Sequence, residues 1–142
     1  MTCDSLLRDF PLSGYRVLQL PIARAGPPAV RLLADWGADV TRIDPPAVAG
    51  RGSVTGRRRG SDEQNLHRNK RSICLDIKTP EGAEVLRRMI ARTDVVVENF
   101  RAAVKKRLGL DYEQLREINP RIILASISGF RQEGPYCDAP RR

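Results

Sequence analysis

Positive charge gathers on both sides of a short apolar segment, SICLDI, at residues 72–77. The cations before and after this segment are Arg68, Lys70, Arg71 and Lys78. A second basic group lies further along the chain and consists of Lys105, Lys106 and Arg107. A ligand with several phosphates and an aromatic base needs spread cations together with an apolar contact for the base. The alternative is that these are solvated charges on exposed loops, where most Lys and Arg side chains lie. Spacing alone leaves both interpretations open.

Histidine and cysteine offer little for nucleophilic or metal chemistry. His67 is the one histidine of the sequence, and in its basic surroundings we expect a solvated loop residue rather than a catalyst. The three cysteines are widely spaced and odd in number: Cys3, Cys74 and Cys137. This pattern matches neither a disulfide framework nor a zinc site, and it suits a reducing compartment. We therefore expect no metal.

The overall composition is that of one globular domain with an excess of positive charge. The chain has 142 residues, of which 41% are hydrophobic, and its net charge is +8. Such a charge favours an anionic partner: nucleic acid, a membrane surface or a phosphorylated small molecule. The alternative is an incomplete chain that lacks an acidic half.

Two of these partner classes are disfavoured by the sequence. Aromatic residues make up 5% of the chain and are not interleaved with the cations, and no nucleic-acid-binding motif occurs. No apolar run approaches the length of a membrane span, and the N-terminus has no signal-peptide pattern. We therefore expect a cytoplasmic protein that binds neither nucleic acid nor membrane.

Apolar runs and turn residues predict alternating strands and helices. Five strands are expected, at 15–20, 38–44, 72–77, 94–100 and 121–130. The first helix begins at Pro27, and the second begins after the predicted cap Thr79. A short basic helix within 101–110 and a helix capped by Asp111 precede the fifth strand. Residues 45–65, rich in Gly, Pro, Ser and Arg, are predicted to form a loop.

This order of elements predicts an α/β fold, a Rossmann-like open parallel sheet with helices on both faces. The inward-facing helix positions are expected to be Ala29, Val30, Leu33, Trp36, Val85, Leu86, Met89, Ile90, Tyr112, Leu115 and Ile118. Residues 1–10 are expected to be a lead-in, and residues 11–142 one Rossmann-like segment. Chemistry in such sheets lies at the carboxyl ends of the strands.

A dinucleotide, one common ligand of such folds, is disfavoured. Gly26 stands alone in the turn after the first strand, where dinucleotide binding needs the pattern G-x-G-x-x-G. Pro27 and Pro28 lack the N–H groups that would bind phosphate there. Asp44 does close the second strand, near the position of a ribose-binding acid. The chemistry of the turn nevertheless argues against NAD.

Six collinear segments carry a resemblance to a known family. They are PLSGYRVLQL, AGPPAVRLLADWGADVTRID, NKRSICLDIKTPEG, DVVVENFR, LGLDYEQLREINPRIILASISGF and GPYCDAP, and they run from Pro11 to Pro140. Together they resemble the N-terminal part of the class III CoA-transferase family, of the CaiB/BaiF type. The resemblance implies an incomplete large domain of such an enzyme. It also implies an interlaced homodimer in the full-length family, with a second chain as another way to supply the missing half.

The resemblance implies activity on acyl-CoA and carboxylic acid substrates. Full-length members move CoA between an acyl-CoA thioester and a free carboxylate through an aspartyl mixed anhydride. A second branch of the family consists of alpha-methylacyl-CoA racemases. The positions that match the family's contacts with coenzyme A are Ala25, Leu75, Lys78, Asn99, Phe100, Val104 and Arg107. The two cations among them would meet CoA phosphates, and Leu75 and Val104 would flank the adenine. Whether the three cations before the third strand contact the ligand or support the fold stays open.

Departures from the family pattern limit what the resemblance implies. Ile22 and Arg24 occupy positions where transferases often carry His or Gln, which leaves the acyl group open. The family's catalytic aspartate is expected beyond Arg142, so we predict no catalytic residue within the chain. Glu98, at a strand end, is expected to be structural rather than a nucleophile. The alternatives are thus part of a transferase or racemase, and a non-catalytic remnant or CoA-binding module.

Overall fold

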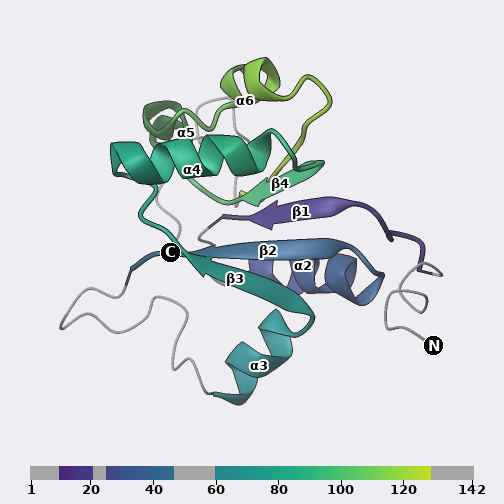
Figure 1. Cartoon of the computed structure of the whole chain (residues 1–142). Helices are drawn as coiled ribbons and strands as arrows, with labels where there is room; N and C mark the ends of the chain where they lie inside the picture. The colour runs from purple at the N-terminus through teal and green to yellow at the C-terminus, as the bar shows by residue number, and fades with distance from the viewer. Residues whose placement is uncertain (1–9, 21–24, 47–59, 129–142) are drawn as a thin grey trace.

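The computed structural model describes residues 10–20, 25–46 and 60–128 (Figure 1). Its strands are β1 (Arg16–Gln19), β2 (Asp39–Asp44), β3 (Lys70–Cys74), β4 (Val95–Glu98) and β5 (Ile123–Ser126). The strands form one sheet in the order β3-β2-β1-β4-β5, and every neighbouring pair is parallel. The helices are α2 (Gly26–Asp35), α3 (Ser61–His67), α4 (Pro80–Ile90), α5 (Ala102–Leu108) and α6 (Tyr112–Ile118).

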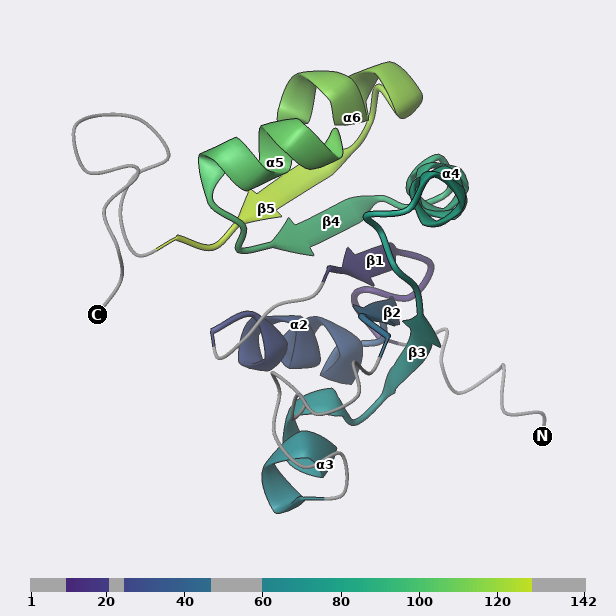
Figure 2. The ribbon, with the colours of Figure 1, turned by 90° about the vertical axis from the view of Figure 1, so that its left-hand side faces the viewer.

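Helices cover both faces of this sheet (Figure 2). The helices α2 and α3 lie on one face, and α4, α5 and α6 lie on the other. The strand order and the two helix layers confirm the predicted Rossmann-like, open parallel arrangement. Among the described residues, no helix is long and apolar enough to cross a bilayer.

Side-chain alternation along the strands divides the core into two clusters, one on each face. The cluster on the α2 face contains Val17, Val30, Ala34, Ala38, Val40 and Val97. The larger cluster, on the opposite face, contains Leu18, Leu20, Ile43, Ile77, Leu86, Ile90, Val96, Leu110, Leu115 and Ile122. Neighbours in sequence, such as Val96 and Val97, therefore belong to different clusters. This burial on both faces explains the continuous apolar run of the fourth strand.

The predicted helix caps are confirmed. Thr79 lies just before α4, and its hydroxyl oxygen accepts a hydrogen bond of 3.1 Å from the backbone N–H of Gly82. Asp111 caps α6 in the same way, accepting from the N–H of Gln114 at 3.0 Å. Each cap satisfies a donor that the first turn of a helix leaves without an internal partner. These local signals fix where the chain leaves the sheet and returns to it.

The prediction of a loop over residues 45–65 is wrong at its end, because Ser61–His67 form helix α3. Residues 47–59 lie outside the described part of the chain. The expectation that His67 is a solvated loop residue is wrong as well, since its side chain is 9% exposed. The segment SDEQNLH has a single strongly apolar residue, so no apolar period marks it as a helix. Ion pairs to the sheet, described below, hold it instead.

The predicted inward faces of the helices are too wide. Trp36, Val85 and Tyr112 are exposed, with Trp36 at 58%, and Ala29 is exposed as well. The helices bury narrower stripes, made of Val30 and Ala34 in α2 and of Leu86 and Ile90 in α4. Trp36 follows the last residue of α2, where the helix has ended and the chain turns at a glycine. Strand boundaries differ as well: the third strand covers Lys70–Cys74 rather than 72–77, the fourth covers Val95–Glu98 rather than 94–100, and the described fifth strand is shorter than 121–130.

Candidate functional site

The strand order creates one natural place for a ligand. All five strands are parallel, so their carboxyl ends lie at the same edge of the sheet. The chain leaves β1 toward α2 on one face and leaves β4 toward α5 on the other (Figure 2). Open α/β sheets bind ligands outside the carboxyl ends of strands at such a switch point. The candidate site therefore lies where β1 and β4 end.

Five of the seven predicted CoA contacts belong to segments that begin at this switch point. Ala25 is exposed and directly precedes α2. Asn99 and Phe100 are half-buried and follow the last residue of β4. Val104 is half-buried and Arg107 exposed on α5, and their spacing of three residues places them on neighbouring positions of one helix face.

The other two predicted contacts lie further along the same edge of the sheet. Leu75 and Lys78 follow β3, which is separated from β4 by β2 and β1. Three strand spacings correspond to about 14 Å. The backbone N–H of Leu75 donates to the Asp44 carbonyl oxygen at 2.9 Å, and the Leu75 side chain packs against the same core cluster as Phe100. Lys78 is exposed in the turn before α4. The structure thus places the predicted residues in two groups along one edge.

Among the described residues, the two candidate phosphate-binding cations have no ion-pair partner. Lys78 and Arg107 are both exposed, and no carboxylate in the described ranges pairs with either. Arg68 and Arg71, by contrast, form ion pairs with Asp35 and Asp39. Cations without a protein counter-ion are the ones available to an anionic ligand.

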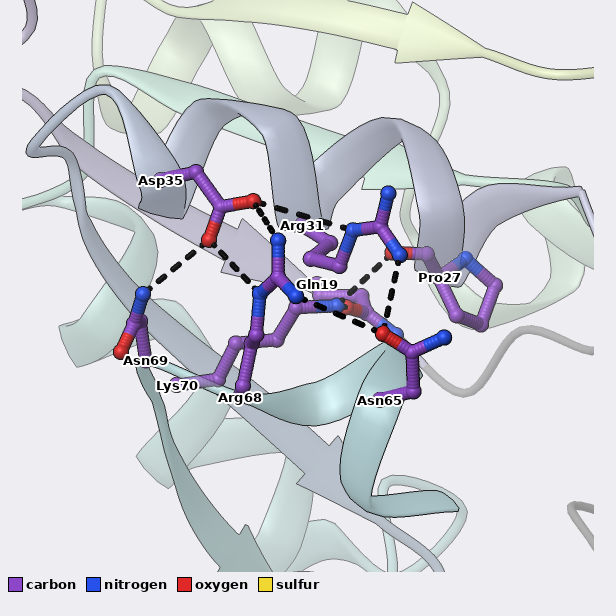
Figure 3. A network of polar contacts seen from close by, with 8 residues as sticks. All are labelled: Gln19, Pro27, Arg31, Asp35, Asn65, Arg68, Asn69 and Lys70. Atoms are coloured by element: carbon purple, nitrogen blue, oxygen red, sulfur yellow. Dashed lines mark hydrogen bonds and ion pairs between the residues drawn. The ribbon is translucent and has the colours of Figure 1, made fainter. Parts of the chain in front are cut away.

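Arg68, Lys70 and Arg71, the cations predicted to precede the third strand, make contacts that support the fold. They lie at the amino end of β3, and Figure 3 shows two of them in a polar network with α2. Arg68 donates to the Asp35 carboxylate at 2.7 Å. The ammonium of Lys70 donates to the Gln19 side-chain oxygen and to the Pro27 carbonyl oxygen, both at 2.9 Å. Burial lowers the pKa of Lys70 to about 8, with a further contribution from the nearby guanidinium groups of Arg42 and Arg31.

A second polar group lies at the end of β2, where dinucleotide-binding folds carry an acidic residue that binds the ribose. Asp44 accepts a hydrogen bond of 2.8 Å from Arg42, whose other terminal nitrogen donates to Glu63 at 2.7 Å. His67 Nε2 lies 3.4 Å from the second Glu63 oxygen, while its buried Nδ1 has no hydrogen-bond partner among the described residues. Burial and the Arg42 charge lower the pKa of His67 to about 4. Asp44 is therefore already engaged by Arg42.

Sequence reasoning missed the buried group at the ends of β4 and β5. Glu98 is fully buried, and its carboxylate pairs with the ammonium of Lys105 at 3.2 Å and accepts from the Ser126 hydroxyl. Its other oxygen accepts from the backbone N–H of Phe100 at 2.5 Å. These contacts confirm the expected structural role of Glu98. The signal for Lys105 was its spacing of three from Leu108, which puts a cation on the inward stripe of a short helix.

Two acidic side chains lie at the ends of described strands. The carboxylates at the strand ends, Asp44 and Glu98, are held by Arg42 and Lys105. In the described ranges, no three His, Cys, Asp or Glu side chains are arranged so that they could hold a metal ion. What the edge presents is a set of exposed cations, among them Lys78, Arg101 and Arg107, together with partly buried apolar side chains.

Comparison with known proteins identifies the family. The model of CoA-transferase family III matches residues 12–141. The chain is 44% identical over 141 residues to the succinate–glutarate CoA-transferase of Agrobacterium fabrum, covering 92% of this chain and 35% of that enzyme. It is 43% identical over 135 residues to the formyl-CoA:oxalate CoA-transferase of Bradyrhizobium diazoefficiens, covering 89% of this chain and 31% of that enzyme.

A solved structure from the same family superposes on this chain. The crystal structure of a CAIB/BAIF family protein from Brucella suis superposes with a TM-score of 0.79 at 38% identity, covering 92% of this chain and 36% of that one. The chain thus spans about a third of the length of the relatives it matches. The chain belongs to CoA-transferase family III, the CaiB/BaiF type.

Proposed function

We propose that this chain binds the nucleotide part of coenzyme A at the carboxyl edge of its sheet. The observation that carries the proposal is the state of Lys78 and Arg107, which are exposed and unpaired within the described part of the chain. Arg107 would bind one phosphate group of CoA and Lys78 another. Leu75 and Val104 supply apolar surface for the adenine, and Asn99 and Phe100 border the switch point together with Ala25.

The activity that we infer for the whole protein is transfer of CoA between an acyl-CoA and a free carboxylic acid. Two relatives compared above are named as CoA-transferases, with succinate and glutarate, or formyl-CoA and oxalate, in their names. This favours CoA transfer over the alternative, an alpha-methylacyl-CoA racemase. The acids in these names have one or two carboxylates, so we propose a short carboxylic acid as the acceptor.

The covalent step belongs to residues outside the described site. In the mechanism that we propose from the family, an aspartate oxygen bonds to the acyl carbon and CoA leaves as its thiolate, giving a mixed anhydride. The CoA thiolate then attacks the aspartyl carbonyl carbon of the anhydride, which releases the donor acid and leaves an aspartyl-CoA thioester. The acceptor carboxylate attacks that thioester carbonyl and CoA leaves again as its thiolate, which gives a second mixed anhydride. The thiolate then attacks the acceptor's acyl carbon, which forms the new CoA thioester and frees the aspartate. The role of this chain is to hold CoA.

Titration calorimetry with coenzyme A tests the binding proposal directly. We expect Lys78→Ala and Arg107→Ala each to weaken the affinity of the 142-residue chain about tenfold, the usual effect of losing a charge-assisted contact with phosphate. Arg121→Ala is the matched control, because Arg121 is an exposed arginine just before β5, at the opposite edge of the sheet. Unchanged affinity in both test variants would remove the assignment.

A further inference from the structure

Glu98, Lys105 and Ser126 form a polar group at the ends of β4 and β5, next to the candidate CoA site. We propose that these three residues are positioning residues, which hold Phe100 and helix α5 in the orientation that CoA binding requires. The inference rests on the proposed function, and it adds residues that do not themselves touch the ligand. It follows from how three separate segments meet at one fully buried carboxylate.

Glu98 connects the end of β4 to the turn that follows. One carboxylate oxygen accepts from the backbone N–H of Phe100 at 2.5 Å, only two residues further along the chain. The other oxygen meets Lys105 at 3.2 Å and the Ser126 hydroxyl. A carboxylate that accepts from several donors at once fixes all of them, because each would otherwise leave a buried charge poorly compensated. The position of Phe100 is therefore set by Glu98.

Lys105 attaches α5 to the sheet. The helix has seven residues and no side-chain hydrogen bond at its N-cap, so it is too short to be stable without tertiary contacts. Lys105 is buried, pairs with Glu98 and donates to Ser126 Oγ at 3.1 Å. At about 100° per residue, Val104 and Arg107 lie about 60° apart on the helix. Since Lys105 fixes the rotation of α5, it also fixes the direction of Arg107.

The Ser126 hydroxyl is engaged inside this group. Its hydroxyl donates to Glu98 and its oxygen accepts from Lys105, so both of its functions are used inside the group. The ammonium of Lys105 is itself paired with a carboxylate. A serine–lysine pair that acted in catalysis would need a lysine that can accept the serine proton. The geometry therefore favours positioning over a second chemistry.

A double-mutant cycle for CoA binding tests the proposal. The four proteins are the 142-residue wild type, Lys105→Met, Arg107→Ala and the double variant, titrated with coenzyme A at a temperature where thermal unfolding shows each to be folded. If Lys105 acts by aiming Arg107, we expect Lys105→Met to weaken binding about tenfold in the wild type and less than about threefold when Arg107 is absent. Ser126→Ala is a milder change, so it should also weaken coenzyme A binding, but by a smaller factor. This variant replaces Lys105→Met in the cycle if Lys105→Met does not fold. Thr93→Val is the control, since Thr93 is buried and its hydroxyl donates to Met89 on α4.

The outcomes separate the two proposals. Suppose first that the wild type binds coenzyme A and that Arg107→Ala weakens binding. If Lys105→Met and Ser126→Ala then have no effect on affinity, or the same effect with and without Arg107, the positioning role is wrong. The proposed function stands in that case. If the wild type does not bind coenzyme A, the proposed function is wrong and the positioning role falls with it. A backbone amide spectrum adds a readout that global stability does not control. The Phe100 amide resonance should shift in Glu98→Gln, because the N–H then loses its carboxylate acceptor.

Discussion

The ammonium of Lys70 donates a 2.9 Å hydrogen bond to the side-chain oxygen of Gln19, so a half-buried cation on β3 faces a neutral amide on β1. Its other acceptor is the carbonyl oxygen of Pro27, which is also neutral. No carboxylate among the described residues forms an ion pair with Lys70. The folded state therefore disfavours the charged form, and the pKa of Lys70 falls from 10.5 to about 8.

We expect Gln19→Glu to stabilise the protein at pH 7. A carboxylate of the same shape would pair with Lys70 and raise its pKa, which should increase the free energy of unfolding by about 1 kcal/mol. In the wild type, the unfolded chain binds the Lys70 proton more tightly than the folded chain between pH 8 and 10.5, so this group adds stability as pH rises through that window. The added carboxylate should flatten the rise. Urea unfolding at pH 7 and pH 10 measures both effects, and Gln19→Leu, which should destabilise, is the control.

The pH dependence of stability on the acidic side should carry the signature of His67. Its pKa is about 4 when folded and 6.5 in its ordinary state, so the unfolded chain binds the proton first as pH falls from 6.5 to 4. The folded state should lose about 3 kcal/mol across that window. The charged groups that face His67 are Arg42, Glu63, Lys70 and Asp44. The difference between wild type and His67→Gln in urea unfolding isolates this term, and an equal loss in the two proteins would contradict it.

Features that depend on residues close together in the sequence could be predicted, whereas features that depend on contacts between distant residues could not. The separate strands and the caps Thr79 and Asp111 were predictable because each is signalled by residues within a few positions along the chain. The parallel sheet was predictable from the alternating order of strands and helices. Helix α3 was not, because its hold on the sheet comes from Glu63 pairing with Arg42, which lies 21 residues earlier. The exposure of Trp36 was missed for a related reason: periodicity gives the face of a helix but not where the sheet beneath it ends.

The candidate site likewise has residues whose position was predictable from the sequence and residues whose contacts were not. Residues such as Phe100 and Lys78 lie at the predicted edge because the order of strands and helices determines where the strands end. Their contact with CoA stays a prediction. The pairing of Glu98 with Lys105 joins a strand end to an inward helix position, and the hydroxyl of Ser126 arrives from the next strand. Such a group depends on tertiary placement, which a single sequence does not give.

Gly82, in the first turn of α4, should resist replacement by alanine. Helix propensity alone predicts that Gly82→Ala stabilises by about 1 kcal/mol. A Cβ at this position, however, would lie 1.9 Å from the backbone carbonyl oxygen of Asp76. Because backbone cannot move aside as a flexible side chain can, we expect a loss of about 3 kcal/mol or more. Ala83→Gly, one residue further, should cost only about 1 kcal/mol, and thermal unfolding of the two variants compares them. Stabilisation by Gly82→Ala would show that the turn before α4 relaxes.

The two proposed phosphate-binding cations should act independently of each other. Lys78 follows β3 and Arg107 lies on the helix after β4, and the two strand ends are about 14 Å apart. Because residues at this separation with no shared partner add in free energy, Lys78→Ala with Arg107→Ala should weaken coenzyme A binding about a hundredfold if each alone weakens it about tenfold. Added salt should weaken the wild type more than the double variant, since the variant has fewer charges to screen. A double variant that binds no more weakly than either single variant would mean that the two cations depend on each other at one phosphate, and the extended placement of CoA along the sheet edge would then be wrong.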